Sequence, residues 1–309
     1  MKKQLTPRQG ARLRTLRRRT ARVLLFLLAA LFALTFLTPT VLTFTNSFMS
    51  STEIAAHYGN VFQNITASGS KKTFISQKVS LRFIPDIVSV QQYLDALFKT
   101  PDYLLKFWNA AILTVPIVVF QLLVAAFASY GFARWRGKLK SMIFFLYIIL
   151  MLMPYQVTLV PNYLISDWLN LLETRWAIWL PGIFSPFAVY ILTKYMRRIP
   201  SAYIEAAKLD GASEWKIFTR VALPLCQSAL FSVAILVFID YWNMVEQPLI
   251  LLTDPDKQPL SVFLSQISTG DVGIGFAVAT VYMVPSLLLF LYGEEYLVEG
   301  IAYAGGIKG

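Results

Sequence analysis

The sequence predicts an all-α membrane protein, a bundle of six transmembrane helices. Its 309 residues are 56% apolar and only 15% charged, with a mean hydropathy of +0.57. A soluble domain carries about 25% charged residues, so most of this exterior must face lipid. A spanning helix needs roughly 20 mostly apolar residues. Six stretches meet that requirement: Val23–Phe44, Phe107–Phe132, Met142–Leu164, Trp176–Tyr195, Leu223–Leu252 and Ile274–Leu297. An open sheet would leave its edge amides unpaired in lipid, and the stretches lack the alternation of a barrel.

Lysine and arginine gather in alternate loops, which predicts the orientation of the bundle. Nine lie in Lys2–Arg22, four in Arg134–Lys140 and six in Lys194–Arg220. Because cytoplasmic loops carry the Lys/Arg excess, both termini are expected in the cytoplasm and residues 45–106 outside it. The net charge of +11 also suggests nucleic acid. Membrane topology explains better why the basic residues gather in alternate loops. We therefore expect the partner to be a lipid bilayer and not a nucleic acid.

The expected organisation follows from these spans and places the chain in the cytoplasmic membrane as a multi-pass protein. It comprises a basic cytoplasmic arm (1–22), a first transmembrane helix (23–44), an extracytoplasmic segment (45–106), a transmembrane core (107–297) with a cytoplasmic loop (197–222), and a cytoplasmic tail (298–309). The apolar core of the first helix exceeds the 7–15 residues of a signal peptide, so we expect it to be uncleaved. Pro154 and Pro161 predict a bent third helix, which either leaves a cavity or only adjusts packing.

The cytoplasmic loop contains a compact charged segment, EAAKLDGASEWKIFTRVALPL, from Glu205 to Leu225. Asp210-Gly211 predicts a turn between two short helices, because glycine tolerates a positive φ. The second helix is expected over Ala212–Val221, with Trp215 and Phe218 on one face as apolar anchors. Such a helix-turn-helix knuckle is suited to a groove on a soluble partner.

The spacing E-A-A-x-x-D-G-A-x(5)-F-x(4)-L-P-L resembles the EAA loop of ABC-importer permeases, although the usual proline a few residues later is absent, near Gln227. Its members here are Glu205, Ala206, Ala207, Asp210, Gly211, Ala212, Phe218, Leu223, Pro224 and Leu225. Phe238–Leu252 and the tail Gly300–Gly309 resemble the MalG-like carbohydrate branch. The resemblance covers nearly the whole chain and is weakest in residues 1–20 and 45–80.

This resemblance implies the MetI-like fold of type I importers and a permease subunit of an ATP-driven, binding-protein-dependent importer, for a sugar or oligosaccharide. Residues 201–221 of the loop would be the coupling helix region, docked on a separate ATPase subunit. The coupling residues would be Glu205, Ala206, Ala207, Asp210, Gly211, Ala212, Trp215 and Phe218, and the tail residues Gly305, Gly306 and Lys308 would enter the ATPase interface. The implied partners are a second, different permease, a homodimeric or heterodimeric ATP-binding subunit and an extracytoplasmic solute-binding protein.

The chain itself is not expected to be an enzyme. It has no G-x-x-x-x-G-K-[ST] phosphate loop, so a partner would use ATP and Mg²⁺, and this chain would bind no cofactor. His57 is the only histidine and Cys226 the only cysteine. That count predicts neither a catalytic Cys-His pair nor a metal site of ordinary zinc composition.

A substrate pathway is predicted from polar residues at membrane depth, where they are expensive and therefore suggest function. The candidates are Tyr155, Gln156, Asn162, Asp240, Trp242, Asn243 and Glu246. Asp240 and Glu246 are six residues apart and would not closely share a helix face, whereas Asn243 is three from both. The alternative is that these residues only bond helix to helix, or that Glu246 lies at the outer interface.

Two other functions remain open at this level. The chain could be an ABC permease for a non-sugar solute such as a peptide, polyamine or phosphonate. It could also be an ion-driven secondary transporter that works without ATP, in which case the knuckle would have no ATPase partner.

Overall fold

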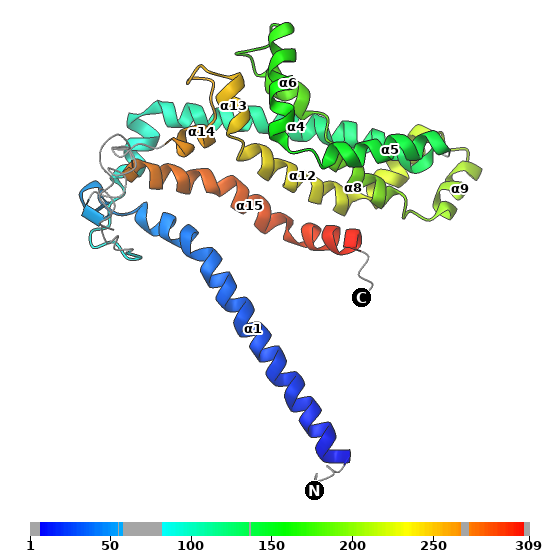
Figure 1. The fold of residues 1–309 in the computed structure, drawn as a ribbon, viewed down its shortest axis with the longest axis horizontal. Coiled ribbons are helices and arrows are strands. Elements are labelled where there is room, and N and C mark those ends of the chain that lie inside the picture. The colour runs from blue at the N-terminus through cyan, green and yellow to red at the C-terminus, as the bar shows by residue number, and fades with distance from the viewer. Residues whose placement is uncertain (1–6, 55, 58–81, 136, 267–271, 306–309) are drawn as a thin grey trace. The chain divides into compact units, whose positions relative to one another are not determined.

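The computed structural model describes residues 7–54, 56–57, 82–135, 137–266 and 272–305 (Figure 1). These residues are almost entirely helical, and the β-structure among them is one bridge between Met49 and Val88. The elements are α1 Pro7–Asn46, α3 Gln91–Leu94, η1 Asp95–Lys99, α4 Pro101–Arg134, α5 Lys138–Met151, α6 Tyr155–Trp168, α7 Trp176–Gly182, α8 Pro186–Met196, α9 Ser201–Leu209, α10 Glu214–Ile217, η2 Phe218–Ala222, α11 Leu223–Leu225, α12 Gln227–Trp242, α13 Glu246–Leu251, α14 Leu260–Ser265 and α15 Val272–Gly305.

Four helical stretches of the described chain are long and apolar enough to cross a membrane: Arg19–Asn46, Pro101–Arg134, Trp176–Met196 and Gly273–Val298. Two bent pairs raise the total to six if each pair is one span. These pairs are α5 with α6, bent by 99°, and Glu214–Leu225 with α12, bent by 73°. The predicted all-α membrane architecture is confirmed.

The third span is bent at Pro154, as its prolines predicted, whereas the fifth span was expected as one helix over Leu223–Leu252 and is broken. Helix α5 ends at Met151 and α6 begins at Tyr155, because Pro154 lacks an N–H and disfavours the helical conformation of the residue before it. Helix α12 ends at Trp242. The amide of Asn243 donates to the Ile239 carbonyl at 2.8 Å, and such local bonds compete with helix continuation.

Helix α1 runs without a break across the expected boundary between the basic arm and the first span. Its threonine hydroxyls donate back to carbonyls four residues earlier, from Thr35 at 2.9 Å, Thr38 at 2.8 Å and Thr43 at 2.9 Å. These bonds satisfy polar groups that lipid would leave without partners. The domain boundaries remain a prediction.

The chain forms two compact units, and α15 contributes to both. The first comprises Met1–Leu94 and Ser268–Thr280. In it, the backbone N–H of Ser89 donates to the Phe48 carbonyl at 2.8 Å, and the rings of Phe48 and Tyr93 lie 5.3 Å apart. These contacts hold the residues before α3 against the chain that follows α1.

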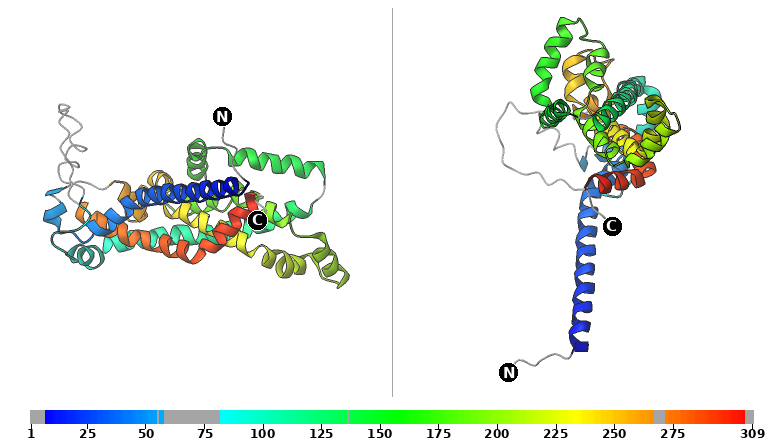
Figure 2. Two further views of the ribbon diagram at one scale, coloured as in Figure 1. Left: turned by 90° about the horizontal axis from the view of Figure 1, so that it is seen from below. Right: turned by 90° about the vertical axis from the view of Figure 1, so that its right-hand side faces the viewer.

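The second unit comprises Asp95–Ile267 and Val281–Gly309, and its centre is α4 packed along α8 and α12 (Figure 2). Ser129 on α4 donates to the Val189 carbonyl of α8 at 3.0 Å. The buried apolar side chains between these helices and α5 are Ala125, Phe132, Phe144, Ala188, Val189, Leu192, Ala229, Val233 and Val237. This core supports the knuckle after α8.

Candidate functional site

The knuckle, residues 201–221, is a helix-turn-helix as predicted. Helix α9 ends at Leu209, and Gly211 follows with a φ of +73°. The N–H of Gly211 donates to Lys208 at 3.0 Å and that of Ala212 to Ala207 at 2.9 Å, which closes the helix in a Schellman motif. The second helix begins at Glu214 rather than at Ala212, because the Ser213 hydroxyl caps it by accepting from the Lys216 N–H at 3.4 Å.

The back of the knuckle is fixed to α4. The Phe218 ring lies 5.0 Å from the ring of Phe127 and 5.1 Å from that of Tyr130. The Tyr130 hydroxyl donates to Glu214 Oε2 at 2.7 Å, and Lys208 Nζ lies 2.6 Å from Glu214 Oε1. Phe218 was predicted as an apolar anchor beside Trp215. Its side chain is 4% exposed and packs against α4 of this chain.

The front of the knuckle carries the other predicted coupling residues at its surface. Glu205, Ala206, Asp210 and Gly211 are exposed, and Ala207 and Ala212 are half-buried. Trp215 is 63% exposed while its ring stacks on Phe127 at 5.8 Å.

Two large side chains on the knuckle were missed by sequence reasoning. Leu209 is 90% exposed and Tyr203 is 57% exposed. The sequence position of Leu209 could have predicted this exposure. Leu209 directly precedes the Asp-Gly turn, and at the end of a short helix no neighbouring turn of that helix covers an apolar side chain. The knuckle therefore presents Leu209, Tyr203 and Trp215 as an exposed apolar set.

The breaks in the third and fifth spans meet at a cavity of about 590 Å³. Five of the seven predicted pathway residues line it: Tyr155, Gln156, Asp240, Asn243 and Glu246. The Gln156 amide donates to the two Glu246 carboxylate oxygens at 3.3 and 3.2 Å, which joins α6 to α13. Asp240 and Glu246 would not share a face of a continuous helix, but the break at residues 243–245 brings both to one cavity. The volume is within the range of small-molecule sites.

The other two pathway candidates lie elsewhere. Trp242 is 2% exposed, its Nε1 donates to the Tyr282 carbonyl at 3.2 Å, and its ring stacks on Phe238 at 5.2 Å. Asn162 is half-buried on α6 and is not among the residues that line the cavity. Trp242 is thus a packing residue in this structure.

Of the three predicted ATPase-interface residues in the C-terminal tail, the structure describes only Gly305. Gly305 is the last residue of α15, and Gly306 and Lys308 fall outside the described residues.

The other end of α4 carries a polar cluster that we call the clamp, formed by Lys106, Asn109, Glu173 and Arg175 with residues 251–258. Lys106 Nζ bonds to Asp102 at 3.0 Å and to the Pro255 carbonyl at 3.1 Å. The buried Asn109 amide donates to the carbonyls of Asp256 at 2.7 Å and Gln258 at 3.3 Å, and its Oδ1 accepts from Arg175 at 3.0 Å.

Glu173 completes the clamp from the loop before α7. Its carboxylate accepts from the Thr253 hydroxyl at 2.6 Å and from the backbone N–H groups of Thr253 at 3.0 Å and Asp254 at 3.2 Å. The Thr253 hydroxyl bond is the largest cause that holds the pKa of Glu173 below its ordinary value of 4.5. Desolvation opposes it, and the two backbone bonds and the Lys257 charge add to the lowering.

The broken helices, the lined cavity and the exposed helix-turn-helix knuckle are features expected of a polytopic membrane transport protein. Residues 96–301 match the family described as "Binding-protein-dependent transport system inner membrane component". The chain belongs to this family. It is a permease component of an ABC importer in the inner membrane, and such a system also includes an ATPase and a solute-binding protein.

Named relatives agree with this assignment. The chain is 28% identical over 234 residues to the arabinooligosaccharides transport system permease AraQ of Halalkalibacterium halodurans, covering 75% of this chain and 84% of that protein. It is 34% identical over 210 residues to the osmoprotective compounds uptake permease GgtD of Synechocystis sp., covering 65% and 70%.

A solved structure shares the fold. It is the crystal structure of a bacterial ABC transporter involved in the import of the acidic polysaccharide alginate, with a TM-score of 0.72 and 20% identity. The match covers 90% of this chain and 96% of that chain.

Proposed function

We propose that the chain translocates a sugar or oligosaccharide and that residues 201–221 dock on a separate ATPase subunit. The observation that carries the proposal is the knuckle's construction. Phe218 and Glu214 fix it to α4, while Leu209, Tyr203 and Trp215 each stay more than half exposed. Exposed apolar residues on a fixed support are typical of a protein interface.

The remaining assignments belong to the same proposal. Both termini lie in the cytoplasm, the ATP-binding subunit is a homodimer or heterodimer that uses ATP and Mg²⁺, and this chain binds no cofactor. Gly305, Gly306 and Lys308 enter the ATPase interface. The second permease is a different chain. ATP-driven closure of the ATPase moves the knuckles and opens the bundle outward, and hydrolysis returns it inward.

Carbohydrate is favoured as the solute by AraQ and by the alginate importer, whose names specify oligosaccharide and polysaccharide. The cavity fits that chemistry, because Tyr155 offers a ring and Gln156 and Asn243 offer amide donors and acceptors. GgtD is named for the uptake of osmoprotective compounds, which makes an osmolyte the second candidate solute.

The docking proposal is tested by purifying the tagged chain in mild detergent and identifying what accompanies it. We expect an ATP-binding subunit and a second permease. A cysteine at Leu209 should crosslink to the ATPase, whereas a cysteine at Phe184, which is 66% exposed near α7, should not. Recovery of the chain alone, with no crosslink from Leu209, would refute docking through the knuckle.

The solute proposal is tested by uptake in vesicles that contain the whole transporter. Glu246→Gln alters the Gln156–Glu246 pair and should change the solute concentration for half-maximal uptake by about 3- to 10-fold, on the scale of one hydrogen bond. Asn162→Ala is the matched control and should leave uptake unchanged. Uptake of an osmolyte, without uptake of any carbohydrate tested, would refute carbohydrate as the solute and support the second candidate.

A further inference from the structure

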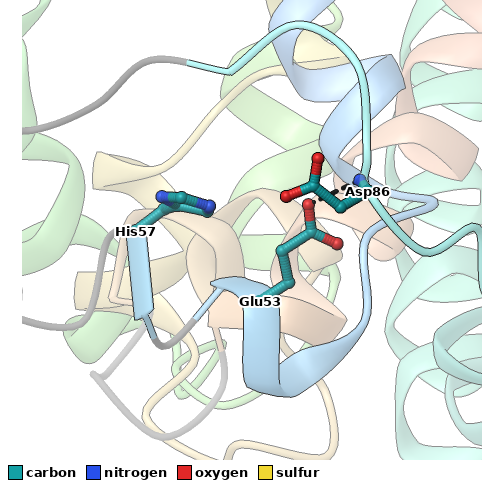
Figure 3. A group of neighbouring side chains, drawn as sticks. All are labelled: Glu53, His57 and Asp86. Atoms are coloured by element: carbon teal, nitrogen blue, oxygen red, sulfur yellow. Dashed lines mark hydrogen bonds between the residues drawn. The ribbon is translucent and has the colours of Figure 1, made fainter.

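The only histidine of the chain lies beside two carboxylates in the segment after α1. Glu53, His57 and Asp86 each offer one ligand atom, and these three atoms all lie within 4.8 Å of one another (Figure 3). The sequence predicted no metal site because one histidine and one cysteine do not make an ordinary zinc site. The structure adds carboxylates from two separate segments, which that count did not consider.

The chain positions these side chains by local geometry and by backbone bonds. Glu53 lies in the helical residues 51–54 and His57 in the helical residues 56–57, and the carboxylate and the imidazole point toward one another (Figure 3). The Glu53 carboxylate accepts from the backbone N–H groups of Asp86 at 2.8 Å and Ile87 at 3.4 Å. These bonds bring Asp86 to the helix although it follows 33 residues later.

We propose that Glu53, His57 and Asp86 bind a divalent transition metal ion, with Zn²⁺ the best fit. An imidazole nitrogen favours zinc, copper or nickel over magnesium and calcium, which prefer oxygen ligands. Three protein ligands and one water complete a tetrahedral zinc site. Ligand atoms in such a site lie about 3.3 Å apart, so the side chains close from a separation of at most 4.8 Å.

Arg82 supports the site from outside. Its NH1 donates to Asp86 Oδ1 at 2.6 Å and also contacts Oδ2. Metal-bound carboxylates and imidazoles are usually oriented by such outer hydrogen bonds. The Arg82 charge offsets one carboxylate, and a bound dication offsets the other.

The ion would connect two segments that are distant in sequence. His57 directly precedes residues 58–81, and Asp86 follows them. A metal bridge between His57 and Asp86 would crosslink two positions far apart in sequence, and such a crosslink removes conformational freedom from the unfolded chain. The site shares no residue with the predicted pathway or the knuckle, so its expected role is to stabilise the segment that carries it.

The test uses the full-length chain with a tag that contains no histidine, in phosphatidylcholine nanodiscs freed of metal by a chelator. Zn²⁺ titration should saturate at one ion per chain. Cu²⁺ as a spectroscopic probe should give imidazole nitrogen couplings in pulsed EPR. A large molar excess of Zn²⁺ should reduce these couplings, because Cu²⁺ binds such ligands more tightly than Zn²⁺. Because His57 is the only histidine, these couplings identify the ligand in the wild-type chain even if a variant fails to fold.

Variants then separate the site from adventitious binding. His57→Gln and Glu53→Gln should each weaken Zn²⁺ binding by about 10- to 100-fold. Asp167→Asn, an exposed carboxylate on α6, is the matched control and should leave affinity unchanged. Absence of imidazole coupling in the wild-type chain, or Zn²⁺ affinity within twofold in folded His57→Gln, would overturn the proposal.

Discussion

The two ends of α4 are built in opposite ways. At the N-terminal end, the polar side chains of the clamp are hydrogen-bonded within this chain. Lys106, Asn109 and Glu173 each form a hydrogen bond with residues 251–258. Toward the C-terminal end of this 34-residue helix, about 30 Å further along, the knuckle is fixed by Phe127 and Tyr130 and leaves Leu209 and Trp215 exposed.

The difference separates structural from interface residues. Polar groups that are buried and bonded, as in the clamp, account for the shape of their own loop. Apolar groups that remain exposed on a fixed support are not explained by the stability of the chain that carries them. The knuckle therefore needs a partner to account for its surface, and the clamp does not.

The largest expected effect comes from the turn of the knuckle. Gly211→Pro places a residue with φ near −65° where the chain needs +73°, and it removes the N–H that bonds to Lys208. We expect transport-coupled ATPase activity to be abolished while the chain remains in the membrane. The measurements are solute-stimulated ATP hydrolysis and the amount of chain in membranes.

Two matched variants sharpen that result. A Cβ at residue 211 would meet no atom within 4 Å, so Gly211→Ala tests backbone conformation alone and should cost about 1–2 kcal/mol in the turn. Gly211→Asn should stay near wild type, because asparagine tolerates the left-handed region. Normal uptake by Gly211→Pro would show that the turn has no coupling role.

The next largest effect is expected at the front of the knuckle. Leu209→Ser removes the most exposed of the apolar side chains identified there and should weaken the ATPase-subunit complex by about 10-fold or more, the range of an interface anchor. The affinity is measured with purified permease and ATPase subunits.

Leu169→Ser, at a leucine that is 47% exposed directly after α6, is its control and should leave that affinity unchanged. If Leu209→Ser also leaves the affinity unchanged, the exposed apolar side chains of the knuckle are not an interface with the ATPase subunit.

The knuckle was predictable because its determinants are local. The Asp210-Gly211 turn needs only a residue that accepts positive φ, and the helix before it follows from its own sequence. The burial of Phe218 was not predictable in this way, because it depends on rings of α4 that lie more than 85 residues earlier. Local spacing placed Phe218 beside Trp215 but could not tell which of the two α4 would cover.

The cavity shows the same limit. Its polar residues were found because such groups are costly in lipid, but their arrangement depends on helix breaks. A continuous fifth helix separates Asp240 from Glu246 and leaves Trp242 beside them. The break at residues 243–245 reverses this relation: the two carboxyl side chains share a cavity, and Trp242 packs against Tyr282.

A smaller effect on transport is expected from the clamp. Asn109→Ala leaves the carbonyls of Asp256 and Gln258 and the Arg175 guanidinium without this partner, which should destabilise the fold by about 1–3 kcal/mol. We expect a lower melting temperature in nanodiscs and unchanged affinity for the ATPase subunit. Asn162→Ala should change neither quantity. Loss of ATPase binding in folded Asn109→Ala would show that the two ends of α4 are coupled.

The smallest effect is a pH dependence confined to the clamp. The folded pKa of Glu173 is lowered, so its contribution to stability is present above the ordinary value of 4.5 and is lost as pH falls through the folded value. Protonation removes the acceptor for the Thr253 and Asp254 N–H groups, and their hydrogen exchange, corrected for the intrinsic pH effect, should rise below pH 4.5. In Glu173→Gln these amides should exchange faster than in wild type at neutral pH, with little further change on acidification. Equal protection in both chains would mean that the backbone bond from Glu173 N–H to the Leu251 carbonyl, at 3.1 Å, holds the loop without the carboxylate.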